Sequence, residues 1–280
     1  MEVEFKEKTY EKYFFKEIAG KARATYSPDQ VDESLLGFDD AFLIHHSTAL
    51  RYLRQIRRNA NLKVGGVTLQ DLSVFTKRLE RRLPPFRFNL FVQYKRPVHL
   101  YSKSAGQWKN WKQPYYRYAV THHQQKILEL IDQKSKKRAA TIYASPAFWR
   151  HEDMWTFADT NRVIANSNIA TARKLNQHDH YSYAKAGGKG KGHSETAEIQ
   201  SEALENILLA GLEGERLTFG EHIQQAATMV KESVQETLPG WPGVAHLSPD
   251  ENQGDLSTFE ALDLLERFSY QFEISYYAIA

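Results

Sequence analysis

Two groups of residues have types and spacing that could do chemistry: Gln93 and Lys95, and the acidic pair Asp39-Asp40. Residues two apart in a β-strand share a face, so Gln93 and Lys95 would project together from the end of an apolar stretch. Adjacent carboxylates repel each other unless a cation lies near them, and hard divalent cations take oxygen ligands. The pattern therefore indicates a divalent-cation site with a lysine beside it.

Each of these features also has a simpler interpretation. Lys95 can be an ordinary strand end whose long side chain reaches solvent. Asp39 and Asp40 can be turn or strand-start residues. A further candidate, Glu11, lies beside the apolar stripe of a predicted first helix, with Glu17 as its rival at the other edge, and either can be a solvated helix glutamate.

The elements that would position these residues follow from the apolar periodicity of the first 150 residues. Pro84 and Pro97 bound the clearest strand, in which apolar residues lead directly to Gln93. The expected elements are a helix at 9–22, a strand at 36–45, helices near 47–59 and 68–83, a strand at 86–96, a helix at 121–133 and a strand at 139–145. This alternation predicts an α/β or α+β sheet core over 1–150, with a basic helical insertion at 46–85.

The second half of the chain has a different pattern. The run Ala-Gly-Gly-Lys-Gly-Lys-Gly at 186–192 is typical of a flexible loop, and it lacks the spacing of a P-loop. Helices are expected at 194–211, 218–238 and 257–277. These predict a mainly helical region, 151–280, packed on the core. Its apolar faces could also form a homodimer or bind a partner protein.

Taken together, residues 9 to about 148 resemble the PD-(D/E)XK nuclease superfamily, whose core is a helix, a mixed sheet and a second helix. In this resemblance Asp39 or Asp40 takes the acidic position, Gln93 the variable acidic or amide position, and Lys95 the lysine. Glu11 takes the glutamate of the first helix. Two features depart from the pattern, since Gln93 replaces an acidic residue and 54 positions separate Asp39 from Gln93.

The resemblance implies a restriction-endonuclease-like fold and metal-dependent hydrolysis of phosphodiester bonds in DNA. Asp39 or Asp40, Gln93 and Glu11 would bind Mg²⁺ or Mn²⁺, which lowers the pKa of an attacking water. Lys95 would orient that water and stabilise the charge that builds on the phosphate. Nucleases of this kind are common in prokaryotic defence, which is the biological setting the resemblance implies.

Charge is distributed unevenly along the chain. Residues 41–150 hold 22 Lys or Arg against 4 Asp or Glu, a net charge of +18, and residues 194–280 have a net charge of −13. An excess of this size around the candidate site favours a polyanion partner such as nucleic acid. Basic residues interleave with tyrosine and tryptophan in the predicted loop at 95–118, which suits phosphate neutralisation with base stacking, although such a loop can also simply pack on the core. Further basic residues lie on the two inserted helices: Arg51, Arg54, Arg57, Arg58, Lys77, Arg78, Arg81 and Arg82.

Cysteine and histidine restrict the other possibilities. The chain has no cysteine, which excludes disulfides, thiolate metal sites and cysteine nucleophiles. A metal site shared by neighbouring histidines is not expected at 45–46 or 122–123. His178, Asp179, His180 and His193 could form a second metal or phosphate site.

Three functions remain open from the sequence. The first is the DNA endonuclease. The second is a non-catalytic nucleic-acid-binding module with a degenerate site, and the third is an interaction protein that uses its acidic helical half. No window is apolar enough for a membrane span and the N-terminus lacks a signal-peptide pattern, so a cytoplasmic location without a membrane partner is expected.

Overall fold

The computed structural model describes residues 2–21, 25–26, 83–211, 213–240 and 256–280. The helices are α1 (Glu7–Lys21), α5 (Trp108–Trp111), α6 (His122–Lys134), α7 (His151–Asp159), the short 3₁₀ helix η2 (Ala172–Leu175), α8 (Leu204–Gly211), α9 (Phe219–Thr237) and α11 (Thr258–Phe272). The strands are β1 (Thr25–Tyr26), β2 (Phe88–Tyr94), β3 (Val98–Leu100), β4 (Tyr115–Ala119), β5 (Ala139–Pro146), β6 (Ser167–Thr171), β7 (His180–Tyr183), β8 (Lys189–His193), β9 (Ala197–Gln200) and β10 (Ile274–Ile279).

The first sheet has the order β1-β10-β2-β5-β6 and is built around β2. Strand β2 is parallel to β5, with α6 as the connecting helix, and antiparallel to β10 from the other end of the chain. All seven residues of β2 are buried, as expected for a strand with neighbours on both edges and helices on both faces. Helices and two sheets, one mixed and one antiparallel, confirm the expected α+β fold.

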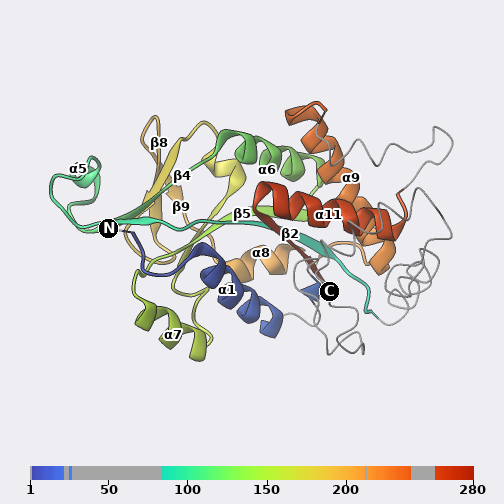
Figure 1. Ribbon diagram of the computed structural model, residues 1–280, viewed down its shortest axis with the longest axis horizontal. Coiled ribbons are helices and arrows are strands. Elements are labelled where there is room, and N and C mark those ends of the chain that lie inside the picture. Colours follow the sequence, from blue (N-terminus) through green and yellow to red (C-terminus); the bar gives the residue numbers. More distant parts are fainter. Residues whose placement is uncertain (1, 22–24, 27–82, 212, 241–255) are drawn as a thin grey trace, which may run out of the picture.

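Helices cover both faces of the first sheet (Figure 1). Alternate residues of β2 face opposite sides. Leu90 and Val92 pack with Tyr10 and Phe14 of α1. Phe91 packs on the other side, in the cluster formed by residues of α6, α9 and α11. The two faces therefore have separate hydrophobic clusters.

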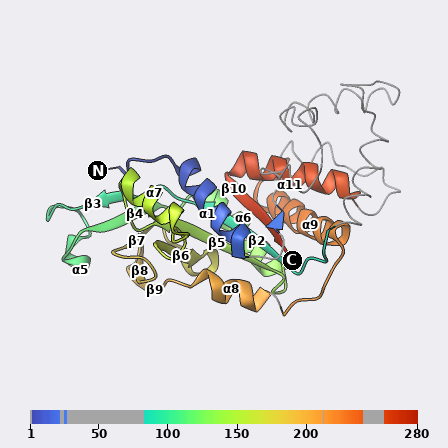
Figure 2. The ribbon, with the colours of Figure 1, turned by 90° about the horizontal axis from the view of Figure 1, so that it is seen from below.

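The second sheet has the order β3-β4-β7-β8-β9, and every pairing in it is antiparallel. It lies with α5 at the end of the molecule away from α9 (Figures 1 and 2). Tyr116, Tyr118, Tyr181 and Tyr183 pack from β4 and β7 into the same cluster as Phe91. One face of this sheet is thus joined to the core of the first.

Several predicted elements are confirmed, namely the helices at 9–22, 121–133 and 218–238 and the strands at 86–96 and 139–145. Three predictions were wrong. The expected loop at 186–192 is mostly strand β8, the expected helix at 194–211 contains β9 before α8, and the helix expected over 257–277 ends at Phe272. Residues 273–277 instead lead into β10, which lies beside β2. Both sheets therefore contain strands from either side of residue 150.

The expected strand at 36–45 and the basic insertion at 46–85 lie almost wholly outside the described residues. The predicted loop at 95–118 contains β3, α5 and part of β4. Within the described ranges, none of the helices is both long and apolar enough to cross a membrane.

Candidate functional site

Gln93 and Lys95 leave β2 on the same face, as the strand period predicts. Gln93 is 1% exposed and lies two positions after Phe91, on the face covered by α6 and α11. The Lys95 Nζ lies 3.4 Å from Gln124 Oε1 of α6, to which it donates a hydrogen bond. It also lies 5.8 Å from the centre of the Tyr143 ring. The sequence thus places an amide and an amine together at the carboxyl end of the central strand.

Two buried amides on β2 differ in how their oxygen atoms are satisfied. Asn89 and Gln93 are both 1% exposed and four positions apart, so they share a face. Asn89 Oδ1 accepts a hydrogen bond of 2.8 Å from the Tyr276 hydroxyl. Gln93 Oε1 accepts none from the described part of the chain. Leaving a buried acceptor unpaired costs about 1 to 3 kcal/mol, so such a group calls for an explanation.

Unpaired buried hydroxyls lie in the same region. Tyr143 pairs with Gln93 in the register of β2 and β5, and Tyr118 stacks on its ring at 6.0 Å between centres. Neither hydroxyl has a hydrogen-bond partner among the described residues. Burial raises the pKa of both phenols, so they stay protonated and can donate. We refer to Gln93, Lys95, Tyr118, Gln124 and Tyr143 as the buried polar cluster.

Burial also affects the pKa of the Lys95 amine. Desolvation lowers the pKa of its amine, while Glu7 and Glu273 act in the opposite direction. Glu7 is half-buried in the first turn of α1, and its Oε2 accepts a 2.9 Å hydrogen bond from the Arg96 backbone amide. Desolvation raises the pKa of Glu7, and Lys95 lowers it. A cation and two carboxylates therefore lie within electrostatic reach of each other at the end of β2.

Glu7 and Glu273 were not predicted from the sequence. Glu7 precedes Glu11 by one helical turn, which is the only signal that could have suggested it. Glu273 forms the left-handed C-cap between α11 and β10, with φ of 54°. Its place beside Lys95 depends on the pairing of β10 with β2, which brings together residues far apart in the sequence.

Glu11 does not share a face with Gln93. Its Oε1 accepts a short hydrogen bond from the Ser275 hydroxyl, and its Oε2 lies 2.8 Å from the Lys8 amine. Ser275 is two positions before Tyr277, which packs with the α1 side of the sheet. Gln93 faces α6 instead. The sequence assigned Glu11 and Gln93 to one metal ion, and their positions on opposite faces of the sheet do not support that assignment.

The rival glutamate has a structural partner. Glu17 is buried, and its Oε2 accepts a 2.9 Å hydrogen bond from the backbone amide of Ile164. Asp39, Asp40 and the histidine pair at 45–46 lie outside the described residues, as do the basic side chains predicted for the inserted helices. Strand β2 is hydrogen-bonded to β10 along one edge and to β5 along the other.

The residues near Lys95 fit a hard cation in part. Amide and carboxylate oxygens are suitable ligands for Mg²⁺, and the unpaired Gln93 Oε1 is a candidate donor. In the described ranges, however, no three His, Asp or Glu side chains are grouped as they would be around a metal ion. A complete ligand set would therefore need oxygen donors besides the described carboxylates.

The histidine-rich segments also form no group of three possible metal ligands among the described residues. His122 Nε2 lies 3.1 Å from Asp179 Oδ1, and the other oxygen of Asp179 accepts a 2.8 Å hydrogen bond from Ser194. His193 Nε2 shares a 2.8 Å hydrogen bond with the Ser182 hydroxyl. The second metal site considered for this segment is thus not formed by the described side chains.

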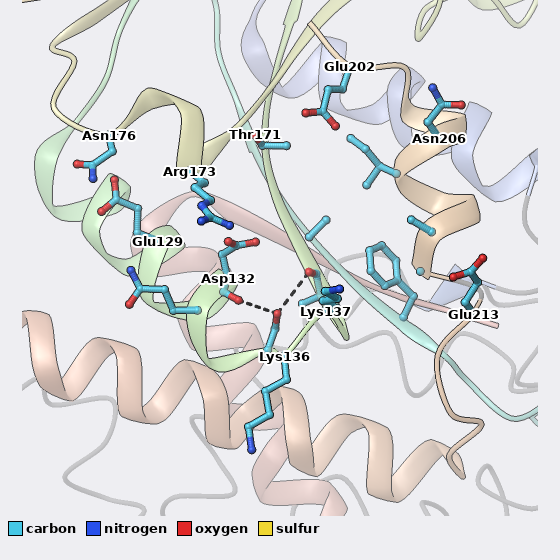
Figure 3. Close-up of a pocket in the computed structure, with 18 residues that line it drawn as sticks. Glu129, Asp132, Lys136, Lys137, Thr171, Arg173, Asn176, Glu202, Asn206 and Glu213 are labelled. Carbon is cyan, nitrogen blue, oxygen red and sulfur yellow. Dashed lines mark hydrogen bonds between the residues drawn. The ribbon is translucent and has the colours of Figure 1, made fainter. Parts of the chain in front are cut away.

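A separate hollow of about 800 Å³ lies at the opposite end of the first sheet. It is bordered by Phe88 and Ala139, which begin β2 and β5, and by charged groups of both signs (Figure 3). Burial raises the pKa of Asp132, and the nearby Arg173 lowers it. Ligands of open α/β sheets bind at the carboxyl ends of parallel strands, where Lys95 lies, and this hollow is at the amino ends.

Comparison with known proteins gives no relative. No protein-family model, no curated protein and no solved structure matches this chain.

Proposed function

We propose that this chain is a metal-dependent nuclease that hydrolyses phosphodiester bonds in DNA, with its site at the carboxyl end of β2. The observation that carries the proposal is the contrast between Asn89 and Gln93. Both amides are buried on one face of one strand, but only the amide beside Lys95 has an unpaired oxygen. An acceptor left unpaired in this way suits a group that binds a ligand.

The residues of the buried polar cluster would then have distinct roles. Lys95 would donate from its Nζ to the attacking water or to a phosphate oxygen, because Gln124 and the Tyr143 ring hold it near the strand end. The buried, protonated Tyr143 hydroxyl would be a second hydrogen-bond donor within the cluster. Gln93 Oε1 would be one ligand of Mg²⁺ or Mn²⁺, and a bound ion would polarise the scissile phosphate and lower the pKa of water.

The metal ion would also need carboxylate ligands. Glu7 is the described carboxylate best placed to contribute, since it lies within electrostatic reach of Lys95. Asp39 and Asp40 stay sequence predictions. The role of Glu11 would be to hold Ser275 and the α1 face of the sheet, as its hydrogen bond suggests.

A second candidate function is a non-catalytic nucleic-acid-binding module with a degenerate site. The amide at Gln93, which stands at an acidic position of the resemblance, favours it, because a neutral ligand lowers the negative charge offered to a metal ion. The two functions differ in whether DNA is cut when Mg²⁺ or Mn²⁺ is supplied.

The test is nicking of supercoiled plasmid DNA with Mg²⁺, with Mn²⁺ and with chelator, by the wild type and by Lys95→Ala. We expect metal-dependent cleavage that falls by roughly 10²- to 10³-fold in Lys95→Ala, as when a donor to a developing charge is removed. Lys16→Ala is the matched control, because Lys16 is an exposed lysine of α1 outside the buried polar cluster, and it should cleave as the wild type does. Undiminished cleavage by Lys95→Ala would overturn the site, and no cleavage by the wild type would favour the binding module.

A further inference from the structure

The Gly-Lys run of β8 has a different role on each face of the second sheet. A Cβ at Gly190 would lie 2.0 Å from the Tyr181 hydroxyl oxygen, and a Cβ at Gly192 would lie 2.4 Å from the His178 ring. A side chain at Gly190 would collide with the fully buried Tyr181, and one at Gly192 would require the His178 ring to move. The alternation places the lysines between them, Lys189 and Lys191, on the opposite face.

The face that carries the lysines extends across neighbouring strands. Arg117 of β4 pairs with Ser182 of β7, which pairs with Lys191 of β8. Lys191 pairs in turn with Glu198 of β9. Lys189 forms an ion pair with Glu198, so one carboxylate faces three cations on this surface.

Helix α5 brings an aromatic side chain over this row. Trp111 Nε1 donates a 3.0 Å hydrogen bond to the Ser182 hydroxyl. The Lys191 Nζ lies 5.2 Å from the Trp111 ring centre and donates a 3.1 Å hydrogen bond to the Asn110 carbonyl. Two segments about 70 residues apart in the sequence, each basic and without acidic residues, thus meet in space.

A hollow of about 660 Å³ lies between these segments. Lys185, Lys189 and Lys191 line it with Trp111, and Gly187 at its edge has a φ of 59°, which turns the chain between β7 and β8. Lys185 and Lys189 are exposed, and Trp111 and Lys191 are half-buried. The hollow therefore combines three amines with one indole ring and one carboxylate, Glu198, which pairs with Lys189.

We propose that this hollow binds the phosphodiester backbone of DNA, with the three lysines on phosphates and Trp111 against a sugar or base. The inference rests on the proposed nuclease function and names the surface that holds its substrate. Lysine amines neutralise phosphates as point charges, and aromatic rings stack on nucleotides independently of sequence. The excess of positive charge in and around the hollow supplies the complementarity that a polyanion requires.

The experiment measures binding of a labelled duplex DNA by fluorescence anisotropy, in chelator and over a range of salt concentrations. The variant Lys185→Gln/Lys189→Gln/Lys191→Gln, which we call the β8 variant, removes the lysines that line the hollow. The matched control, Lys136→Gln/Lys137→Gln/Lys231→Gln, removes the same charge from the region around α6 and α9. We expect the first variant to bind at least about tenfold more weakly, with a slope of log K against log salt smaller by about 2 to 3. The control should stay close to the wild type.

The outcomes separate this inference from the proposed nuclease function. Wild-type affinity and slope in the β8 variant, an equal loss in the control, or no binding of DNA by the wild type would each overturn the hollow as a DNA site. Binding of duplex RNA but not of duplex DNA would overturn the choice of ligand. Loss of binding in the β8 variant without any cleavage by the wild type would support the hollow and overturn the nuclease function. Unchanged cleavage kinetics in the β8 variant would support the nuclease function and overturn the hollow as a DNA site.

Discussion

In the described part of the chain, the two sheets have the same number of strands but different surroundings. In the first, β2 is covered on both faces, so every polar side chain on it must find a partner or remain unpaired in the core. In the second, one face packs on the core and the other carries the cations of β8. In the first sheet, a single unpaired amide oxygen can therefore indicate a ligand-binding group. In the second sheet, a single exposed charge indicates little, and only a group of charges points to a binding surface.

The largest expected effect on stability concerns the packed face of the second sheet. Gly190→Ala should lower the free energy of unfolding by about 3 kcal/mol, because its Cβ would collide with the buried ring of Tyr181. Gly106→Ala is the control, since nothing lies within 4 Å of its added Cβ, and it should change stability by less than about 0.5 kcal/mol. Urea denaturation measures both. Similar values for the two variants would show that the glycines of β8 do not depend on close packing.

A smaller effect on stability is expected from the protonation of two histidines, one from each region. His222 lies on α9, and burial lowers its pKa to about 4. Desolvation, together with neighbouring histidines and cations, lowers the pKa of His193 on β8 to about 4. Each is neutral when folded and protonates near pH 6.5 when unfolded, so the stability it contributes is complete above that pH and is lost as the pH falls towards 4.

We expect His222→Gln to remove more of this acid sensitivity than His193→Gln, because His193 is partly exposed and solvent screens its charge. The difference for His222 should be on the order of 2 kcal/mol between pH 6.5 and pH 4. The measurement is the free energy of unfolding of both variants at several pH values. A steeper pH dependence in His222→Gln than in the wild type would contradict the assignment.

The smallest effect concerns how α9 begins against the first sheet. The Thr218 side chain and Glu221 form a capping box at its N-terminus. Thr218→Ala should cost about 1 kcal/mol of stability, because it leaves the Glu221 amide without its acceptor. Thr228→Ala, at an exposed position within the same helix, should have little effect or a slightly favourable one. Thermal unfolding of the two variants tests the difference, and equal losses would contradict a specific role of the cap.

The sequence predicted the elements whose periodicity is strong and local. The apolar run before Gln93 and the stripe from Tyr10 to Ile18 were sufficient for β2 and α1. The strand β8 was missed because its glycines resemble a loop, and only the packing of Tyr181 shows why they are needed. Strand β10 was missed because helical spacing continues almost to Phe272 and the partner strand, β2, is about 180 residues away.

The candidate site was predictable to a similar degree. That Gln93 and Lys95 share a face follows from the strand period alone. Which side Glu11 faces, and the presence of Glu273 near Lys95, depend on the pairing of β10 with β2. The presence of Glu7 depends on the hydrogen bond between α1 and the Arg96 amide. Such long-range pairings leave no local signal in the sequence.

The central claim is that the side-chain oxygen of Gln93 is unpaired because it serves function and not folding, whereas its Nε2 donates a hydrogen bond to the Tyr94 carbonyl. Gln93→Met tests it directly, since methionine has a similar unbranched shape and removes the buried acceptor. Plasmid cleavage and the free energy of unfolding are measured on the same preparation. We predict cleavage reduced by about 10²-fold or more, with stability unchanged or increased by up to about 1 kcal/mol. Full cleavage together with a clear loss of stability would contradict the claim, because the amide would then be part of the packing alone.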